Sequence, residues 1–179
     1  MPRLFTAITL PDLLAERLAL IRGHLVGGRF LEKENLHLTL RFAGDIDNRT
    51  ADSFADLLAQ IAFPAFQLEI VGLGAFGGDR PRSLHAIVKP TPELERLQAD
   101  NERAARAAGL APESRRFTPH VTIARLKGTR SREVAAYLGA QGGLSAGPFL
   151  VERFCLMSSR PSTGGPPYVV EDVYDCERG

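Results

Sequence analysis

The hydrophobic positions divide the chain into short apolar runs, which are typical of strands, and longer segments with helical spacing. The runs predict strands at residues 3–10, 36–42, 66–73, 83–89, 119–125, 149–157 and 168–174. Apolar residues three or four positions apart predict helices at residues 11–22, 50–61, 92–108 and 132–139. This mixture indicates an α+β fold with antiparallel sheet.

The order of these elements occurs twice along the chain. Three pairs of residues in corresponding elements are each 83 positions apart: His37 and His120, Phe66 and Phe149, and His85 and Tyr168. An element order that repeats at a constant offset predicts two similar units. We therefore expect one domain over residues 1–179, with an internal repeat of approximately 3–85 and 86–174. Its two pseudo-symmetric lobes would each have antiparallel sheet and flanking helices, with an active-site cleft between them.

Composition narrows the class of protein. The 179 residues can bury a substantial core, and 44% hydrophobic with 24% charged residues is ordinary for a soluble globular protein. The sequence lacks an apolar run of bilayer-spanning length and a secretory signal, so we expect a cytoplasmic protein without a membrane partner. Cys155 and Cys176 do not form a C-x-x-C motif, and we expect them to be reduced thiols.

The net charge is only +1, but basic residues are concentrated in one segment. Residues 115–132 contain no Asp or Glu and six basic residues, namely Arg115, Arg116, Arg125, Lys127, Arg130 and Arg132. Such a segment is either a solvated face or an anion-binding face. Because the segment surrounds His120, an anion-binding face is favoured.

The candidate chemistry lies in two H-x-T segments, one in each unit: His37-Leu38-Thr39-Leu40 and His120-Val121-Thr122-Ile123. Residues i and i+2 of a strand point to the same face, so each histidine projects beside its threonine. The apolar residues of both segments point to the opposite face of the sheet, where they can be buried in a hydrophobic core. An imidazole titrates near pH ~6.5, and a threonine hydroxyl can donate a hydrogen bond to a phosphate oxygen.

Two such pairs on opposite sides of a phosphodiester would form a clamp. One histidine would activate water and the other would protonate the leaving oxygen, while Thr39 and Thr122 hold the non-bridging oxygens. This chemistry needs no metal or cofactor, and the sequence has no evident carboxylate cluster for a divalent ion. A single H-x-T segment in a strand is more often structural than catalytic. The duplication in corresponding strands is what favours a phosphoesterase.

The residues around both motifs resemble the 2H phosphoesterases, and within them the RNA 2′,3′-cyclic phosphodiesterases, also called 2′-5′ RNA ligases. The matching segments run through nearly the whole chain: Leu4–Ile8, His37–Gly44, Gly74–Phe76, Pro81–Leu84, Phe117–Arg125, Ser158–Ser159, Gly164–Gly165 and Tyr168. The resemblance implies hydrolysis of 2′,3′-cyclic phosphate at RNA 3′ ends, or of 2′,3′-cyclic nucleotides, to a 2′-phosphomonoester. Nothing in the sequence requires an oligomer, and we expect a monomer.

The resemblance also implies individual roles. His37 would be the general acid toward the leaving 3′ oxygen, and His120 the general base on water. Arg125 would contact phosphate, and Phe42 would pack beside the nucleotide. Strict alternation places both on the face opposite their histidines, so a bulge or a strand end would have to turn them in. His85 occupies a position where many relatives carry Trp. It would either stack on a base or be a half-buried strand histidine.

Two further functions are compatible with the same residues. The site run in reverse would join RNA ends by a 2′-5′ linkage, and a non-catalytic module would bind RNA ends or nucleotides through residues 115–132. Two intact histidines favour catalysis, because binding alone needs no titratable pair. Residues 72–77 match G-x-G-x-x-G. A loop and a strand rather than a helix are expected after them, which argues against a dinucleotide-binding fold.

Overall fold

The computed structural model describes residues 3–141, 143–160 and 165–177, so Gly164 lies outside the described residues. The strands are β1 (Arg3–Thr9), β2 (Gly28–Phe30), β3 (His37–Asp45), β4 (Phe66–Phe76), β5 (Ser83–Val88), β6 (His120–Leu126), β7 (Ala146–Val151), β8 (Arg153–Ser159) and β9 (Val169–Asp175). The helices are α1 (Asp12–Leu20), α2 (Asn48–Leu58), α3 (Pro92–Ala107) and α4 (Ser131–Gln141), with a 3₁₀ turn, η1 (Lys33–Asn35). The predicted α+β class is confirmed.

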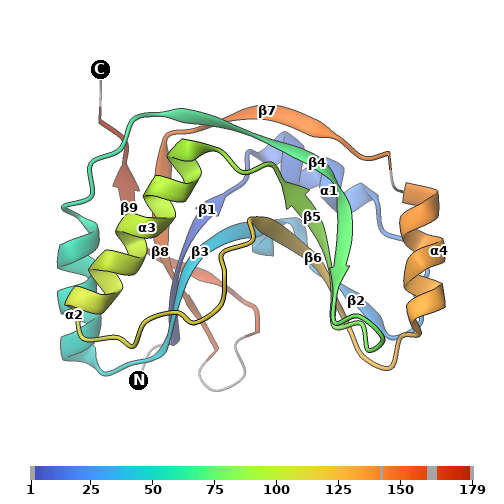
Figure 1. The fold of residues 1–179 in the computed structure, drawn as a ribbon, viewed down its shortest axis with the longest axis horizontal. Helices are drawn as coiled ribbons and strands as arrows, with labels where there is room; N and C mark the ends of the chain where they lie inside the picture. The colour runs from blue at the N-terminus through green and yellow to red at the C-terminus, as the bar shows by residue number, and fades with distance from the viewer. Residues whose placement is uncertain (1–2, 142, 161–164, 178–179) are drawn as a thin grey trace.

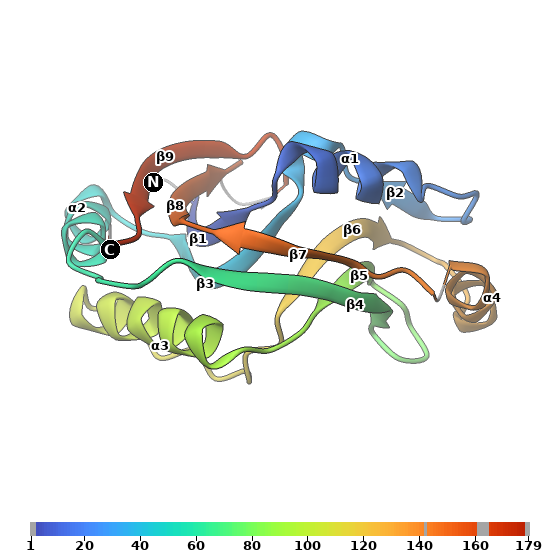
Figure 2. The ribbon, with the colours of Figure 1, turned by 90° about the horizontal axis from the view of Figure 1, so that it is seen from above.

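The nine strands of the described residues form one antiparallel sheet in the order β7-β4-β5-β6-β3-β1-β8-β9, and β2 also pairs with β6. Figures 1 and 2 show the sheet bent into an arch, with β3 and β6 at its centre, α2 and α3 at one end and α4 at the other. The two central strands meet antiparallel, with Leu38 opposite Val121. The sheet therefore has a first lobe of β3, β1, β8 and β9, and a second lobe of β6, β5, β4, β7 and β2.

Each lobe contains strands from both halves of the sequence. β4 lies between β5 and β7 in the second lobe, whereas β8 pairs with β1 in the first lobe. The lobes are therefore not the two halves of the sequence. The prediction of one strand over residues 149–157 is wrong, because β7 and β8 lie on either side of Glu152 and pair in different lobes. The exposed charged pair Glu152-Arg153 interrupts the apolar residues at the point where the chain passes from one strand ladder to the other.

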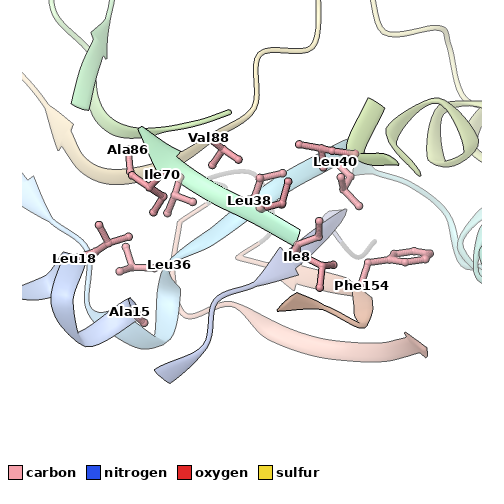
Figure 3. Close-up of a cluster of buried hydrophobic side chains, with 14 of the residues drawn as sticks. Ile8, Ala15, Leu18, Leu36, Leu38, Leu40, Ile70, Ala86, Val88 and Phe154 are labelled. Carbon is pink, nitrogen blue, oxygen red and sulfur yellow. The ribbon is translucent and has the colours of Figure 1, made fainter. Parts of the chain in front are cut away.

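The apolar residues of the two H-x-T segments are buried, as predicted. Leu38 and Val121 are 0% exposed, and Leu40 and Ile123 are 3% exposed. Figure 3 shows Leu38 and Leu40 among buried side chains of neighbouring elements, and α3 packs against β3. Complete burial of a side chain of this size contributes about 1.5–3 kcal/mol to folding. The core therefore holds both motif strands in place.

Side chains that precede two of the helices determine where those helices begin. The Asp47 carboxylate accepts a hydrogen bond from the Thr50 N–H at 2.9 Å, at the start of α2. The Thr91 hydroxyl accepts one from the Leu94 N–H at 3.2 Å, and Pro92 is the first residue of α3. Each cap satisfies an N–H group that has no partner within its helix. The helices accordingly begin at residues 48 and 92, close to the predicted 50 and 92.

In the described residues, no helix combines the length and the apolar character needed to cross a membrane. Cys155 is buried and Cys176 is partly buried, and both are free thiols.

Leu38→Ala is expected to lower the free energy of unfolding by about 2–5 kcal/mol, because it leaves a cavity where the two lobes join. Chemical denaturation followed by circular dichroism measures the change. Leu13→Ala is the matched control, since Leu13 is 82% exposed in α1, and it should change the free energy of unfolding by less than about 0.5 kcal/mol. Equal losses in the two variants would contradict a structural role for Leu38 at the junction.

Candidate active site

A bulge in β3 turns Phe42 toward the face that carries His37 and Thr39. Thr39 and Arg41 pair with consecutive residues of β1, so Leu40 between them has no partner of its own. Leu40 and Arg41 are both buried, which interrupts the alternation, and the next residue, Phe42, is exposed on the motif face. The bulge that the predicted role of Phe42 requires is therefore present.

β6 has the same bulge at the equivalent position. Thr122 and Ala124 pair with consecutive residues of β5, so Ile123 has no partner of its own. Ile123 and Leu40 are related by the same offset as the two motifs, since 123 − 40 = 83. The bulge turns Arg125 to the face that carries Thr122. The two motif strands thus share a backbone irregularity as well as a sequence pattern.

The motif strands border a cavity of about 420 Å³. Its lining comes from both lobes: Phe5, Leu31, His37, Thr39, Phe42, Arg82, Ser83, Thr122, Arg125, Leu126, Ser159 and Tyr168. Five of the residues predicted for the site are in this set. His120 begins β6, two positions before Thr122 and on the same face. Within the described part of the chain, the lining contains two arginines and no carboxylate, which suits an anionic ligand.

Both motif histidines are oriented by the backbone two residues earlier. The Nδ1 of His37 is 2.9 Å from the Asn35 carbonyl oxygen, and the Nδ1 of His120 is 2.6 Å from the Thr118 carbonyl oxygen. A carbonyl oxygen only accepts, so Nδ1 must donate in each ring and Nε2 remains for a ligand. Each Nε2 can accept a proton when the ring is neutral and donate one when it is charged. The geometry equips both histidines for proton transfer.

The side chains around the two histidines differ. The ring centroids are 4.9 Å apart for His37 with Phe5 and for His37 with Tyr168, 4.8 Å for His120 with Phe76, and 5.3 Å for His120 with His85. Burial lowers the pKa of His37 to about 4, and the positive charges of His120 and Arg125 act in the same direction. His37 is therefore neutral at pH 7 in the free protein. A bound phosphate anion would raise the pKa of this imidazole.

Tyr168 is a site residue that the sequence did not predict, although the 83-residue offset pairs it with His85. It lies just before β9, and its hydroxyl accepts a hydrogen bond from the Arg125 guanidinium at 3.1 Å. Its N–H donates to the Asn35 side chain at 3.4 Å. Tyr168 thus connects the first lobe with Arg125 of the second. Six other lining residues had no predicted role: Phe5, Leu31, Arg82, Ser83, Leu126 and Ser159.

The proposal that His85 stacks on a base needs correction. His85 is only 6% exposed, because Phe76 stacks on it at a centroid distance of 4.1 Å and His120 lies beside it. A ring enclosed in this way has no open face for a base. Burial lowers the pKa of His85 to about 4, so the ring is neutral, and no group of the described residues forms a hydrogen bond with its buried Nδ1. His85 therefore packs against the His120 ring and limits the positions that this ring can take.

Residues 72–77, which match G-x-G-x-x-G, do not begin a helix. Residues up to Phe76 belong to β4, which confirms the argument against a dinucleotide-binding fold. Gly74 has a packing role, since a Cβ at this position would lie 2.9 Å from Nε2 of His85. The glycine leaves room for the His85 ring next to β4, and this ring contacts His120.

The His37 imidazole is expected to titrate near pH 4 in the free protein and at higher pH with inorganic phosphate bound. Burial disfavours the imidazolium, and an adjacent anion favours it. Nuclear magnetic resonance of the ring nitrogens, with and without saturating phosphate, measures both values. The exposed His24, outside the cavity lining, is the internal reference. A His37 titration that phosphate leaves unchanged would contradict an anion site beside this ring.

His85→Phe is expected to raise the free energy of unfolding at pH 7, and to raise it more at pH 5. The ring contacts remain, while a buried nitrogen that has no hydrogen-bond partner among the described residues is removed. Such a nitrogen costs the wild type about 1–3 kcal/mol. The unfolded chain protonates His85 below about pH 6.5, but the folded protein does so only near pH 4. The unfolded state binds more protons in this window, so wild-type stability falls as pH drops from 6.5 toward 4.

Urea denaturation at the two pH values measures the effect of His85→Phe. His24→Gln, at an exposed position, is the control for loss of a histidine and should leave the stability unchanged. Lower stability of His85→Phe at pH 5 than the wild type would show that the buried nitrogen has a stabilising partner.

Comparisons with known proteins agree with this geometry. The family described as the 2′-5′ RNA ligase superfamily matches residues 10–162. The RNA 2′,3′-cyclic phosphodiesterase of Aeropyrum pernix is 36% identical over 159 residues, which cover 85% of this chain and 90% of that protein. A protein of the same name from Aquifex aeolicus is 32% identical over 153 residues, which cover 82% and 81%. The crystal structure of E. coli LigT complexed with 3′-AMP has a TM-score of 0.75, at 23% identity over 99% of both chains.

An antiparallel sheet in which each lobe brings one H-x-T strand to a shared cavity defines the 2H phosphoesterase class. Within that class, the chain belongs to the 2′-5′ RNA ligase superfamily. The resemblance drawn from the motifs and their flanking segments is thereby confirmed, and the likeness to LigT confirms the fold.

Proposed function

We propose that the protein hydrolyses RNA 2′,3′-cyclic phosphodiester ends to 2′-phosphomonoesters by metal-independent acid–base catalysis with His37 and His120. The observation that carries this proposal is the matched orientation of the two imidazoles, each with Nδ1 on a backbone carbonyl and Nε2 available. The hydrolysis of a cyclic phosphodiester is supported by the names of the relatives from Aeropyrum pernix and Aquifex aeolicus.

The proposed reaction has one proton transfer at each histidine. Nε2 of His120 takes a proton from water as the water oxygen attacks phosphorus. Nε2 of His37 gives its proton to the 3′ oxygen as the bond between phosphorus and that oxygen breaks. The phosphate then remains on the 2′ oxygen, and a free 3′ hydroxyl is formed. The family resemblance supports this assignment of acid and base, because the backbone contacts of the two rings are alike.

The acid role of His37 depends on the substrate's own charge. His37 is neutral at pH 7 in the free protein, since burial lowers its pKa to about 4. A phosphodiester anion in the cavity favours the imidazolium. Binding of the substrate would therefore raise the pKa of His37, so that its Nε2 carries the proton that the acid must donate. The positive charges of Arg125 and His120 would be offset by the same anion.

The other predicted site residues have supporting positions. Thr39 and Thr122 line the cavity beside the two histidines, where their hydroxyls would donate to the non-bridging oxygens, and Arg125 would balance the phosphate charge. Phe42 also lines the cavity, and the Arg3 guanidinium lies 5.0 Å from its ring centroid. The exposed part of this ring would pack beside the nucleoside.

Three further features belong to the proposal. Residues 1–179 would act as one bilobal domain, because the cavity lining comes from both lobes. The protein would act as a monomer, since both histidines belong to the same chain and the same sheet. It would work in the cytoplasm, where RNA ends are present. Reverse 2′-5′ ligation would use the same two histidines with their acid and base roles exchanged.

His37→Ala and His120→Ala are each expected to lower kcat by about 10²-fold to 10⁴-fold, because each removes a proton-transfer group. Hydrolysis of 2′,3′-cyclic AMP in EDTA, with identification of the monophosphate product, measures the effect. Circular dichroism verifies the fold, and His24→Ala is the control at an exposed position. The wild type should give the 2′-monophosphate with a bell-shaped pH dependence of kcat/KM.

Three results would overturn the proposed function: full activity of either variant, loss of wild-type activity in EDTA, or binding of the cyclic nucleotide without product. The third would indicate a binding module. In the described residues, no group of three or more His, Cys, Asp or Glu side chains is placed to hold a metal ion. EDTA therefore tests the mechanism directly.

A further inference from the structure

The short strand β2, which the sequence did not predict, places Arg29 next to the cavity. Arg29 pairs with Arg125 across the antiparallel ladder of β2 and β6. Side chains of directly opposite residues project from the same face, with Cβ atoms about 4.5–5.5 Å apart. Since Arg125 lines the cavity, Arg29 continues its cationic surface outward along the same face. The neighbouring residue, Phe30, packs on the other face against Tyr137, with ring centroids 6.1 Å apart.

The backbone of β2 is fixed to β6 on both sides of Arg29. The Lys127 N–H donates to the Gly27 carbonyl at 2.9 Å, and the Leu31 N–H donates to the Ile123 carbonyl at 2.9 Å. Gly27 has a φ of +76°, and a Cβ there would lie 2.1 Å from the Lys127 carbonyl oxygen. The glycine therefore allows β2 to approach β6 closely, which gives Arg29 a defined place.

A third arginine completes the edge of the cavity. Arg82 directly precedes β5, lines the cavity, and accepts a backbone hydrogen bond from the Leu126 N–H at 2.8 Å. We call Arg29, Arg125 and Arg82 the arginine row. The Arg29 side chain is exposed, and within residues 3–141, 143–160 and 165–177 no carboxylate forms an ion pair with it. Its charge is available to a ligand.

Within the described residues, the first lobe has no strand that corresponds to β2. In the described sheet, β3 is bordered only by β6 and β1, so no strand is paired with it as β2 is with β6. Arginines in two strands of this lobe have acidic partners: Arg3 pairs with Asp45 at 2.6 Å, and Arg153 pairs with Asp175 at 3.5 Å. The two sides of the cavity thus differ in charge although their backbones are similar.

We propose that Arg29 binds the phosphate on the 5′ side of the terminal nucleotide, so that the protein acts on RNA chain ends in preference to cyclic mononucleotides. This inference rests on the proposed function, and it assigns the path of the RNA away from the cavity. An RNA chain carries a phosphate at every nucleotide, so it follows the side of the cavity on which Arg29 is exposed. A cyclic mononucleotide has no second phosphate and does not reach Arg29.

The test compares two substrates, 2′,3′-cyclic AMP and a triadenylate that ends in a 2′,3′-cyclic phosphate, over a range of NaCl concentrations. The wild type should have the higher kcat/KM on the triadenylate at low salt, with a steeper decline as salt rises. Arg29→Gln should lower kcat/KM on the triadenylate by about fivefold at low salt and reduce the slope of its logarithm against log salt by about 0.7. Hydrolysis of 2′,3′-cyclic AMP should stay within about twofold of the wild type.

Two further variants complete the test. Arg29→Lys keeps the charge and should retain most of the preference for the triadenylate. Arg49→Gln makes the same change of net charge at an exposed position in α2, at the other end of the molecule (Figure 1), and should behave as the wild type. Thermal denaturation shows that each variant is folded.

The outcomes separate the inference from the proposed function. If the wild type hydrolyses neither substrate, the proposed function is wrong. If it hydrolyses both and Arg29→Gln matches the wild type on the triadenylate, the inference is wrong while the proposed function stands. Equal slowing of both substrates by Arg29→Gln would place Arg29 at the reacting phosphate, and this result would also overturn the inference.

Discussion

The antiparallel contact between β3 and β6, where Leu38 faces Val121, is the constraint on which the site depends. Each of these residues lies between the histidine and the threonine of its motif, and both are completely buried. Burial of Leu38 and Val121 therefore directs both H-x-T pairs to the opposite face, next to each other. The bulges at Leu40 and Ile123 then turn a further side chain of each strand to that face.

Similar backbones with different surroundings explain how two alike motifs can have different roles. His37 and His120 have the same contact between Nδ1 and a carbonyl oxygen. His37 lies against Phe5 and Tyr168, whereas His120 has a second imidazole, His85, beside it. The proposed mechanism requires one acid and one base, and side chains outside the motifs would supply the difference between the two histidines.

The same asymmetry extends to the edges of the cavity. The second lobe has gained β2, with Arg29 opposite Arg125, while the arginines of β1 and β8 in the first lobe are paired with carboxylates. A polyanion therefore meets two unlike sides. In the proposed function, the similar motif strands would bind the reacting phosphate, and the unlike edges of the cavity would bind the rest of the nucleic acid.

The sequence by itself determined the fold class, most strands and helices, and the two H-x-T pairs. Periodicity is a local property, and the motifs and their spacing can be read directly from the sequence. It also indicated that a bulge or a strand end would be needed to turn Phe42 and Arg125 to the motif face. Only the tertiary structure decided that β4 lies in the second lobe and β8 in the first, and that β2 pairs with β6. It also decided that Tyr168 contacts Arg125 and that His85 lies beside His120. These depend on contacts between residues far apart in the chain. A short glycine-flanked strand such as β2 carries no local signal for such contacts.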